Sequence, residues 1–306
     1  MKNYVTLTFL ISALFLLGCE QNRLGQAPIP DNYETMIAEW EQERIETLKE
    51  PTGWMRLAGM FWLNEGENSF GSGTDQDIRF PEGTIPGHAG YFVVEGGEVS
   101  IRVDDGVEIS AAGNRVTEQL IFDGDEAVDL EHGTLEFLVI EREGEGELAI
   151  RLFNKENEKV DNFDGFPRYP LNPEWRLKAK FIPNTDEKTI SIVNVLGQNI
   201  DAPSPGTVEF EVDGERYRID ALEGSERLFL IVADETNQTE TYQAGRYIYI
   251  DYPEEGSDYT VIDFNKIYNP PCAYNLYTTC QLPPQQNRLD LAIGAGEKRP
   301  VDWDGL

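Results

Sequence analysis

The stretch "TVEFEVDGERYRI", residues 207–219, decides the class of fold. Apolar and polar residues alternate on both sides of Asp213-Gly214, and Asp-Gly is a dipeptide that favours the tight turn of a β-hairpin. β-branched and aromatic residues dominate the apolar positions, as is typical of strands. The stretch therefore predicts two antiparallel strands joined by a two-residue turn.

Short runs of the same kind recur along most of the chain, and no helical pattern lies between them. They occupy residues 99–103, 134–140, 147–153, 176–181, 189–195, 227–233 and 247–251. Many short strands with frequent turns predict a mainly β protein with an antiparallel β-sandwich or barrel-like body.

A proline-rich stretch, residues 159–176, interrupts the series of strands. Its three prolines, in "KVDNFDGFPRYPLNPEWR", favour an ordered connection over a strand. The stretch either divides the body into two β units, residues 51–158 and 159–306, or lies inside one continuous β body.

One amphipathic helix is expected ahead of the strands, at residues 33–50. Tyr33, Ile37, Trp40 and Leu48 recur at helical spacing, and acidic residues occupy most of the other side. A one-sided apolar stripe predicts a helix that packs against the body of the protein.

The N-terminus has the pattern of a bacterial lipoprotein signal. Lys2 supplies positive charge, and residues 5–17 form an apolar run of signal-peptide length. The letters LLGC, ending at Cys19, resemble the lipobox, which implies cleavage before this cysteine and lipid attachment to it. Residues 1–18 would be removed and residues 19–32 would form a flexible tether. We expect a protein of the bacterial cell envelope, held at the membrane surface and facing the periplasm or the exterior.

The composition excludes several classes of function. The chain has 56 acidic and 25 basic residues, a net charge of −31, so it would repel the phosphates of nucleic acids. His88 and His132 are the only histidines, which excludes a histidine-rich metal site. The sequence contains no GxSxG, P-loop or dinucleotide-binding motif, and we expect neither metal nor cofactor.

Residues 66–90, "GENSFGSGTDQDIRFPEGTIPGHAG", resemble the start of a forkhead-associated domain, and the likeness extends to about residue 151. It rests on three dipeptides, Phe70-Gly71, Asp77-Ile78 and His88-Ala89. That family is a β-sandwich that binds phosphothreonine peptides through an arginine and a Ser-Arg pair. Here Ser72 and Pro86-Gly87 stand at those positions. The resemblance therefore implies a sandwich without phosphopeptide recognition.

A broader resemblance covers most of the chain. The blocks "PTGWMRLAGMFWLNEGENSFG", "ETYQAGRYIYID", "DFNKIYNPPCAYNLYTTCQLPP" and "NRLDLAIGAGEK" occur in order. They resemble the domain-of-unknown-function family 1684 of bacteria and archaea. The resemblance implies membership of a family and brings no established activity with it.

The C-terminal blocks supply candidate site residues. Alternation in "GRYIYID" puts Arg246 on the same face as Ile248 and Ile250. If this strand forms a hairpin with "YTVIDFN", Arg246 lies near Asp263, and a charge on an apolar face needs such a partner. The pair would be either a structural ion pair or the wall of a polar pocket. The full set of candidate binding residues is Glu240, Tyr242, Arg246, Asp263, Asn265, Tyr274, Asn275 and Glu297.

Cys272 and Cys280 form an even pair once Cys19 is lipidated, which favours a disulfide in an exported protein. A zinc site or a catalytic thiol is disfavoured, because the spacing fits no common zinc motif and no base is nearby. The disulfide would order the loop 269–287 and leave residues 274–279 as its exposed tip. Tyr274, Asn275 and Tyr277 would then border a cleft beside Arg246.

The sequence leaves three functions open. The first is binding of a small polar or carbohydrate-like ligand, because tyrosine and tryptophan combine an apolar face with a polar tip. The second is a hydrolase that uses carboxylates such as Asp263, Glu240 or Glu297. The third is a structural component of an envelope complex. No particular protein partner is indicated.

Overall fold

The computed structural model describes residues 24–142 and 147–300 of the 306-residue chain. The expected signal peptide and Cys19 lie outside the described residues. The described part is mainly β, with one long helix near its N-terminal end, which confirms the predicted class of fold. Within it, no helix is both apolar enough and long enough to cross a membrane.

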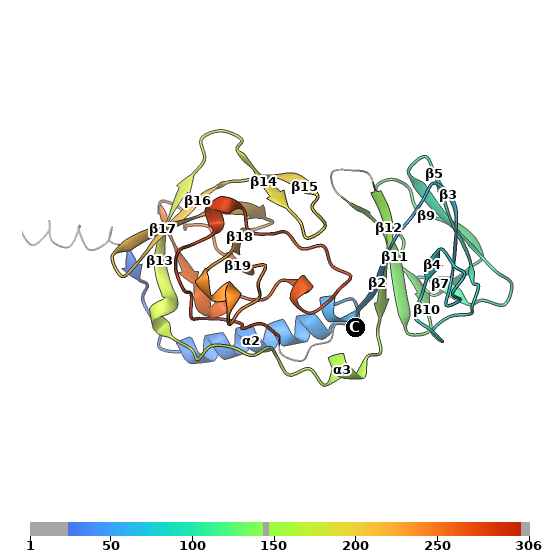
Figure 1. The fold of residues 1–306 in the computed structure, drawn as a ribbon, viewed down its shortest axis with the longest axis horizontal. Helices are drawn as coiled ribbons and strands as arrows, with labels where there is room; N and C mark the ends of the chain where they lie inside the picture. Colours follow the sequence, from blue (N-terminus) through green and yellow to red (C-terminus); the bar gives the residue numbers. More distant parts are fainter. Residues whose placement is uncertain (1–23, 143–146, 301–306) are drawn as a thin grey trace, which may run out of the picture.

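The segment that follows the helix forms a sandwich of two sheets (Figure 1). The first sheet runs in the order β2 (Leu57–Trp62), β12 (Glu147–Asn154), β11 (Leu135–Arg142), β10 (Leu130–His132), β7 (Ile109–Ala111) and β8 (Asn114–Val116). The second runs in the order β4 (Ile78–Arg79), β3 (Gly66–Gly71), β5 (Gly90–Glu95), β6 (Glu98–Val103) and β9 (Glu118–Phe122). Phe70, Phe92 and Phe137 are fully buried in the core that the two sheets share.

The C-terminal part forms one seven-stranded sheet. Its strands are β1 (Gly25–Gln26), β13 (Arg176–Pro183), β16 (Gly206–Val212), β17 (Glu215–Gly224), β18 (Arg227–Val232) and β19 (Arg246–Ile250), with β20 (Tyr259–Asp263) paired to β13. β16 and β17 are the hairpin predicted from residues 207–219, with Val212 opposite Glu215. Asp213 and Gly214 both have positive φ, at 52° and 83°, as a type I′ turn requires.

This sheet curls until its two edge strands, β19 and β20, contact each other. The Thr260 hydroxyl donates to the Asp251 carbonyl at 2.7 Å, next to the point where the edges meet. Arg246 was expected near Asp263 on the condition that β19 and β20 form a hairpin, and that condition is not met. β19 pairs with β18, and β20 pairs with β13, where Arg176 lies opposite Asp263. β19 and β20 follow each other in the sequence, but each pairs with a different neighbour in the sheet.

The helix α2 (Tyr33–Lys49) lies along the curled sheet and ends near the sandwich, as Figure 1 shows. Tyr33, Ile37 and Leu48 are buried, which fits the apolar stripe. At its last turn, the Lys49 ammonium donates to the Asp161 carbonyl at 2.7 Å. α2 therefore packs against both the sheet and the connection between the two β units.

The residues ahead of α2 are part of the body, although a flexible tether was expected for residues 19–32. Leu24 and Ala27 are buried, and β1 pairs with β13 through Gly25 and Lys178. β16 pairs only with the second half of β13, so the first half offers an open edge that β1 fills. From residue 24 onward the tether prediction is wrong, and residues 19–23 lie outside the described part.

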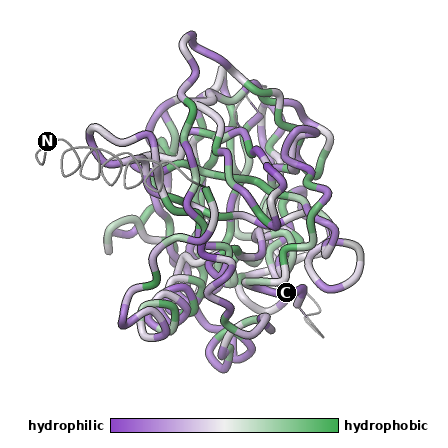
Figure 2. The backbone as a smooth tube through the Cα atoms, turned by 90° about the vertical axis from the view of Figure 1, so that its left-hand side faces the viewer, coloured by the Kyte–Doolittle hydropathy of each residue, from purple (hydrophilic) through white to green (hydrophobic). Residues whose placement is uncertain are grey.

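The remaining elements are short. They are the hairpin β14 (Thr189–Val193) and β15 (Asn199–Pro203), the helix α3 (Glu158–Asp161), and the 3-10 helices η1 (Trp54–Arg56), η2 (Pro173–Trp175), η3 (Glu235–Gln238), η4 (Phe264–Lys266), η5 (Pro271–Ala273) and η6 (Gln285–Asn287). Figure 2 shows hydrophobic stretches running through the interior, with polar stretches at many of the outer loops. The sandwich and the curled sheet have separate hydrophobic cores, on either side of the proline-rich connection. Domain boundaries at residues 51–158 and 159–306 stay a prediction.

Candidate functional site

Arg246 lies in the protein interior, and its side chain is 0% exposed. Its guanidinium donates to the Asp234 carboxylate at 2.8 Å and to the Ala295 and Ile293 carbonyls at 2.6 and 3.0 Å. Asp263 is not its partner, so the expected Arg246–Asp263 pair is wrong. The ion pair with Asp234 joins the end of β18 to β19 and holds the C-terminal segment against them. Arg246 is thus a structural residue and is not available to a ligand.

Asp234 was not among the candidates read from the sequence. Besides Arg246, its carboxylate accepts hydrogen bonds from the Thr236 backbone N–H and hydroxyl, at 2.9 and 2.5 Å. These bonds cap the start of η3. The only sequence signal for Asp234 as the partner of Arg246 was its position directly after the apolar run of β18. That signal can be used only once β18 is known to pair with β19.

Asp263 and Asn265 do come together, at the start of α2. The Tyr33 hydroxyl donates to both Asp263 carboxylate oxygens, at 2.9 and 3.0 Å, and Arg176 approaches the same carboxylate at 3.4 Å. The Asn265 amide donates to the Tyr33 hydroxyl at 2.9 Å. Burial and the neighbouring Asp263 carboxylate raise the pKa of Tyr33 above its ordinary value. This cluster fastens the helix to β20.

Glu297 holds the middle of α2 against the C-terminal segment. Its carboxylate accepts two hydrogen bonds from Arg44, at 2.5 and 3.2 Å, and one from the Asn269 backbone N–H at 2.7 Å. Arg168 lies 3.9 Å away. Burial disfavours the charge on Arg44, but the Glu297 carboxylate outweighs burial and raises the pKa of Arg44 above its ordinary value.

Two other candidates lie near the surface or contact backbone only. The Glu240 carboxylate is about half exposed and accepts a hydrogen bond from the Lys298 ammonium at 2.9 Å. This hydrogen bond lowers the pKa of Glu240. The Tyr242 hydroxyl donates to the Cys272 carbonyl at 3.1 Å, and burial raises the pKa of Tyr242.

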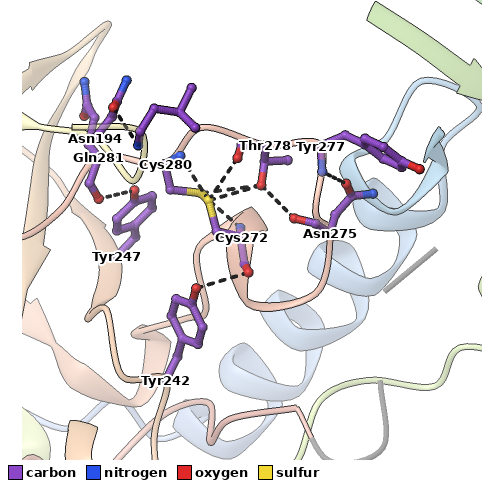
Figure 3. The surroundings of a disulfide bond; sticks show 10 residues. Asn194, Tyr242, Tyr247, Cys272, Asn275, Tyr277, Thr278, Cys280 and Gln281 are labelled. Carbon is purple, nitrogen blue, oxygen red and sulfur yellow. Dashed lines mark hydrogen bonds between the residues drawn. A yellow bond between two sulfur atoms is a disulfide. The ribbon is translucent and has the colours of Figure 1, made fainter. Parts of the chain in front are cut away.

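Cys272 and Cys280 are joined in a disulfide with their Cα atoms 5.9 Å apart (Figure 3). In that view Tyr242 and Tyr247 lie on one side of the sulfur atoms and Tyr277 on the other. The Tyr247 hydroxyl donates to the Gln281 carbonyl at 2.7 Å, which ties the loop to β19. The loop is therefore ordered by backbone contacts as well as by the disulfide.

Of the expected exposed tip, residues 274–279, only Leu276 is exposed. Tyr274 and Asn275 are 3% and 2% exposed, whereas Leu276 is 79% exposed. The Asn275 amide donates to the Leu57 and Trp54 carbonyls, at 2.7 and 3.2 Å, so it connects the loop to the start of the sandwich. The tip prediction is wrong because the Asn275 amide is buried against the backbone at the start of the sandwich, where it donates to two carbonyls.

A groove of about 980 Å³ lies where the edge strands β19 and β20 meet, between them and α2. Aromatic side chains form much of its lining. They are Trp40, Trp54, Phe229, Tyr247, Tyr249, Tyr252, Tyr259, Tyr268 and Tyr274. Phe229 and Tyr249 stack with their ring centroids 4.7 Å apart. The volume lies at the upper end of the range typical of small-molecule sites.

Three cations that line this groove lie over aromatic rings that also line it. The Arg44 guanidinium lies 4.2 Å from the centre of the Tyr268 ring. The Lys178 ammonium lies 4.1 Å from the centre of the Tyr259 ring. The Arg227 guanidinium is 5.0 Å from the centre of the Tyr249 ring. Such contacts hold a cation in place without neutralising its charge.

Of the eight candidate binding residues, Asp263 and Tyr274 line the groove. The other six, and Tyr277, do not. Those six are Glu240, Tyr242, Arg246, Asn265, Asn275 and Glu297. The groove also uses Trp40 and Arg44 of α2 and Lys178 of β13, which the sequence did not mark as site residues. The periodicity of α2 and β13 predicts which side chains share a face of each element. It does not predict which distant segments meet at that face.

The described residues offer little for carboxylate or metal chemistry. The buried carboxylates of Asp234, Asp263 and Glu297 each accept hydrogen bonds from protein donors. In the described part of the chain no group of three or more His, Cys, Asp or Glu residues could hold a metal ion. The aromatic groove is therefore the best candidate site.

The fold and the groove define a class of protein: a mainly antiparallel β protein with an aromatic groove at the open seam of a curled sheet. Residues 161–298 match the model of the family described as "Protein of unknown function (DUF1684)". This match supports the predicted resemblance for the last three of the four blocks, whereas the first block, residues 51–71, lies outside it. The matched part contains β13 to β20 and the disulfide loop, whereas α2 lies outside it. The forkhead-associated resemblance stays a prediction.

Among solved structures, the chain is similar to an uncharacterised protein of Haloarcula marismortui determined by solution NMR. The identity is 29%, and the match covers 49% of this chain and 83% of that chain with a TM-score of 0.39. No curated protein matches the chain.

Proposed function

We propose that this protein binds a small polar or carbohydrate-like ligand in the groove between α2, β19 and β20. The observation that carries the proposal is the aromatic lining of one groove of ligand size. The apolar face of a sugar ring packs on tyrosine and tryptophan rings, while its hydroxyls bond to the polar tips. The groove is lined by both residue types.

Exposure of the rings supports the same proposal. Tyr249 and Tyr252 are each 36% exposed, although large aromatic residues are usually covered. A ligand in the groove would cover apolar surface on both rings. The hydrolase alternative has less support, because Asp263 and Glu297 are engaged by Arg176, Arg44 and Tyr33. Each of the three carboxylates named for that chemistry, Asp263, Glu240 and Glu297, already has a cationic partner in the protein.

The proposed setting is the surface of a bacterial envelope membrane, to which Cys19 would attach the protein through lipid. This placement is supported by the sequence pattern that ends at Cys19. A binding protein held at a membrane meets small polar solutes that pass through the envelope.

A binding screen with a matched tyrosine pair tests the proposal. Thermal shift of the full-length protein with sugars and sugar derivatives would identify ligands, and calorimetry would measure their affinity. Tyr249→Ala should weaken binding about tenfold, because it removes one aromatic contact with the ligand. Tyr91→Ala is the control, since Tyr91 also lies under an arginine, Arg102 at 4.9 Å, but on the sandwich. Unchanged affinity in both Tyr249→Ala and Tyr252→Ala would place the ligand elsewhere and contradict the proposal.

A further inference from the structure

The charge of the groove differs from that of the chain. The whole chain has 56 acidic and 25 basic residues, whereas the groove is lined by five basic and four acidic side chains. A negatively charged solute is repelled by most of such a protein. At the groove this repulsion of a negatively charged solute is weaker, because basic side chains slightly outnumber acidic ones in the lining.

The charged side chains that line the groove differ in burial and in whether they have a partner of opposite charge. Two of the groove cations, Arg44 and Arg176, pair with the buried carboxylates of Glu297 and Asp263. The other acidic side chains of the lining are Glu43, Asp251 and Glu254, and all three are exposed. Negative charge without a cationic partner is thus confined to the solvent-facing side of the groove.

Of the three cations that remain, Lys178 has a further interaction within the protein, so two are left for a ligand. Lys266 is half-buried, and Arg227 lies over the Tyr249 ring. Within residues 24–142 and 147–300, neither has a carboxylate within ion-pair distance. A guanidinium stacked on a ring keeps its N–H edge available to a carboxylate. An unpartnered, half-buried ammonium gains from an anion because part of its hydration is already lost.

We propose that the ligand is acidic: a sugar or similar polar ring with a single carboxylate, of which a uronic acid is the simplest example. This inference rests on the proposed binding function and adds the charge of the ligand to it. The ring packs against the tyrosines of the groove, and Lys266 and Arg227 bind the carboxylate. The exposed Glu43, Asp251 and Glu254 disfavour ligands with several negative charges, so the groove selects a monoanion.

The test compares matched pairs of sugars by calorimetry on the full-length protein. D-Galacturonate and D-glucuronate are measured against D-galactose and D-glucose, at low salt and at 0.5 M sodium chloride. We expect the acid of each pair to bind about tenfold more tightly, and this preference to shrink in high salt because the ion pair is screened. Galacturonate and galactose differ in charge and share the stereochemistry of the ring, so the comparison isolates the carboxylate.

Three variants assign the effect to the groove cations. Lys266→Gln and Arg227→Gln should each weaken uronate binding about five- to tenfold and leave the neutral sugar unchanged, and Lys266→Arg should retain most of the binding. Lys188→Gln is the control, since Lys188 is partly exposed and pairs with Asp220 outside the groove. Circular dichroism melting verifies that each variant folds.

The outcomes separate the two proposals. If neutral sugars bind as tightly as their acids, or if neither Lys266→Gln nor Arg227→Gln lowers uronate affinity, the acidic ligand is excluded and the binding function stands. If neither class of sugar binds at millimolar concentration, both proposals are overturned for carbohydrate ligands.

Discussion

At the scale of single residues, the buried charges serve the fold. Arg246 and Asp234 are both fully buried and bonded to each other, and Arg246 also bonds to three backbone carbonyls of the C-terminal segment. Removing one partner of such a pair leaves an uncompensated buried charge, which is very costly. The stability of the curled sheet therefore depends on two side chains that no ligand reaches.

Asp234→Asn should lower the free energy of unfolding by about 3–5 kcal/mol, because Arg246 would keep its charge without a carboxylate partner. Urea denaturation followed by tryptophan fluorescence measures the change. Glu240→Gln serves as the comparison and should change stability little, since the Glu240–Lys298 pair is on the surface. A loss below about 1 kcal/mol for Asp234→Asn would show that the pair is not important to the fold.

The buried tyrosines predict a loss of stability at alkaline pH. Burial raises the pKa of Tyr268 and Tyr274 above their ordinary value, and the same holds for Tyr33 and Tyr247. In the unfolded chain these groups lose their protons near pH 10, whereas the folded protein retains them. The unfolded state then binds fewer protons, so stability is intact below about pH 10 and falls as the pH rises further.

Urea denaturation at pH 8, 10 and 11 would measure this dependence. Tyr268→Phe should reduce the loss of stability above pH 10, because phenylalanine has no proton to lose. Stability that is level between pH 9 and pH 11 would contradict the assignment of these tyrosines as buried and protonated.

At the scale of elements, the disulfide loop and α2 build the groove from outside the sheet. The loop supplies Pro271 and Tyr274 to the lining, and α2 supplies Trp40 and Arg44. Glu297 connects the two, through Arg44 on the helix and Asn269 at the start of the loop. The groove thus depends on the docking of two segments that are distant in sequence.

Replacing both cysteines, Cys272→Ser with Cys280→Ser, should destabilise the protein by about 2.5 kcal/mol, the entropy of closing so short a loop. Ligand affinity should fall as well, because the loop forms one wall of the groove. Thiol titration of the unfolded, unreduced protein checks the bond itself. Two free thiols in properly exported protein would show that the loop is ordered without a covalent link.

At the scale of the whole molecule, two β units with separate cores share one helix, and the acidic surface is interrupted at the groove. The body begins at β1, which is paired to the sheet from Gly25. Only residues 20–24 lie between the expected lipidation site and this strand. Five residues span at most about 18 Å when extended, so a lipid on Cys19 would hold the body close to the membrane surface.

Cys19→Ser should abolish membrane attachment, because the serine hydroxyl cannot take the thioether-linked lipid. Detergent phase partitioning and intact mass measure the change, with Cys272→Ser as the control that leaves Cys19 in place. Membrane attachment that persists in Cys19→Ser, with an unchanged mass, would exclude lipidation at this residue.

The sequence by itself determined the features that depend on neighbouring residues. The hairpin of β16 and β17 follows from alternation around Asp213-Gly214, and α2 follows from its apolar spacing. The burial of Arg246 beside Ile248 and Ile250 was also predictable, since alternate residues of a strand share a face. These patterns lie within a few residues of one another, and local backbone geometry makes them visible in the sequence.

Only the tertiary structure decided which strands pair and which side chains meet. Arg246 forms an ion pair with Asp234. Asp263 accepts a hydrogen bond from Tyr33, which lies 230 positions away in the chain. Alternation assigns a residue to a face, but a strand's neighbours depend on the curvature of the whole sheet and on the segments that fill its edges. The groove belongs to this second group, because it exists only where β19 and β20 approach each other beside a helix from the other end of the chain.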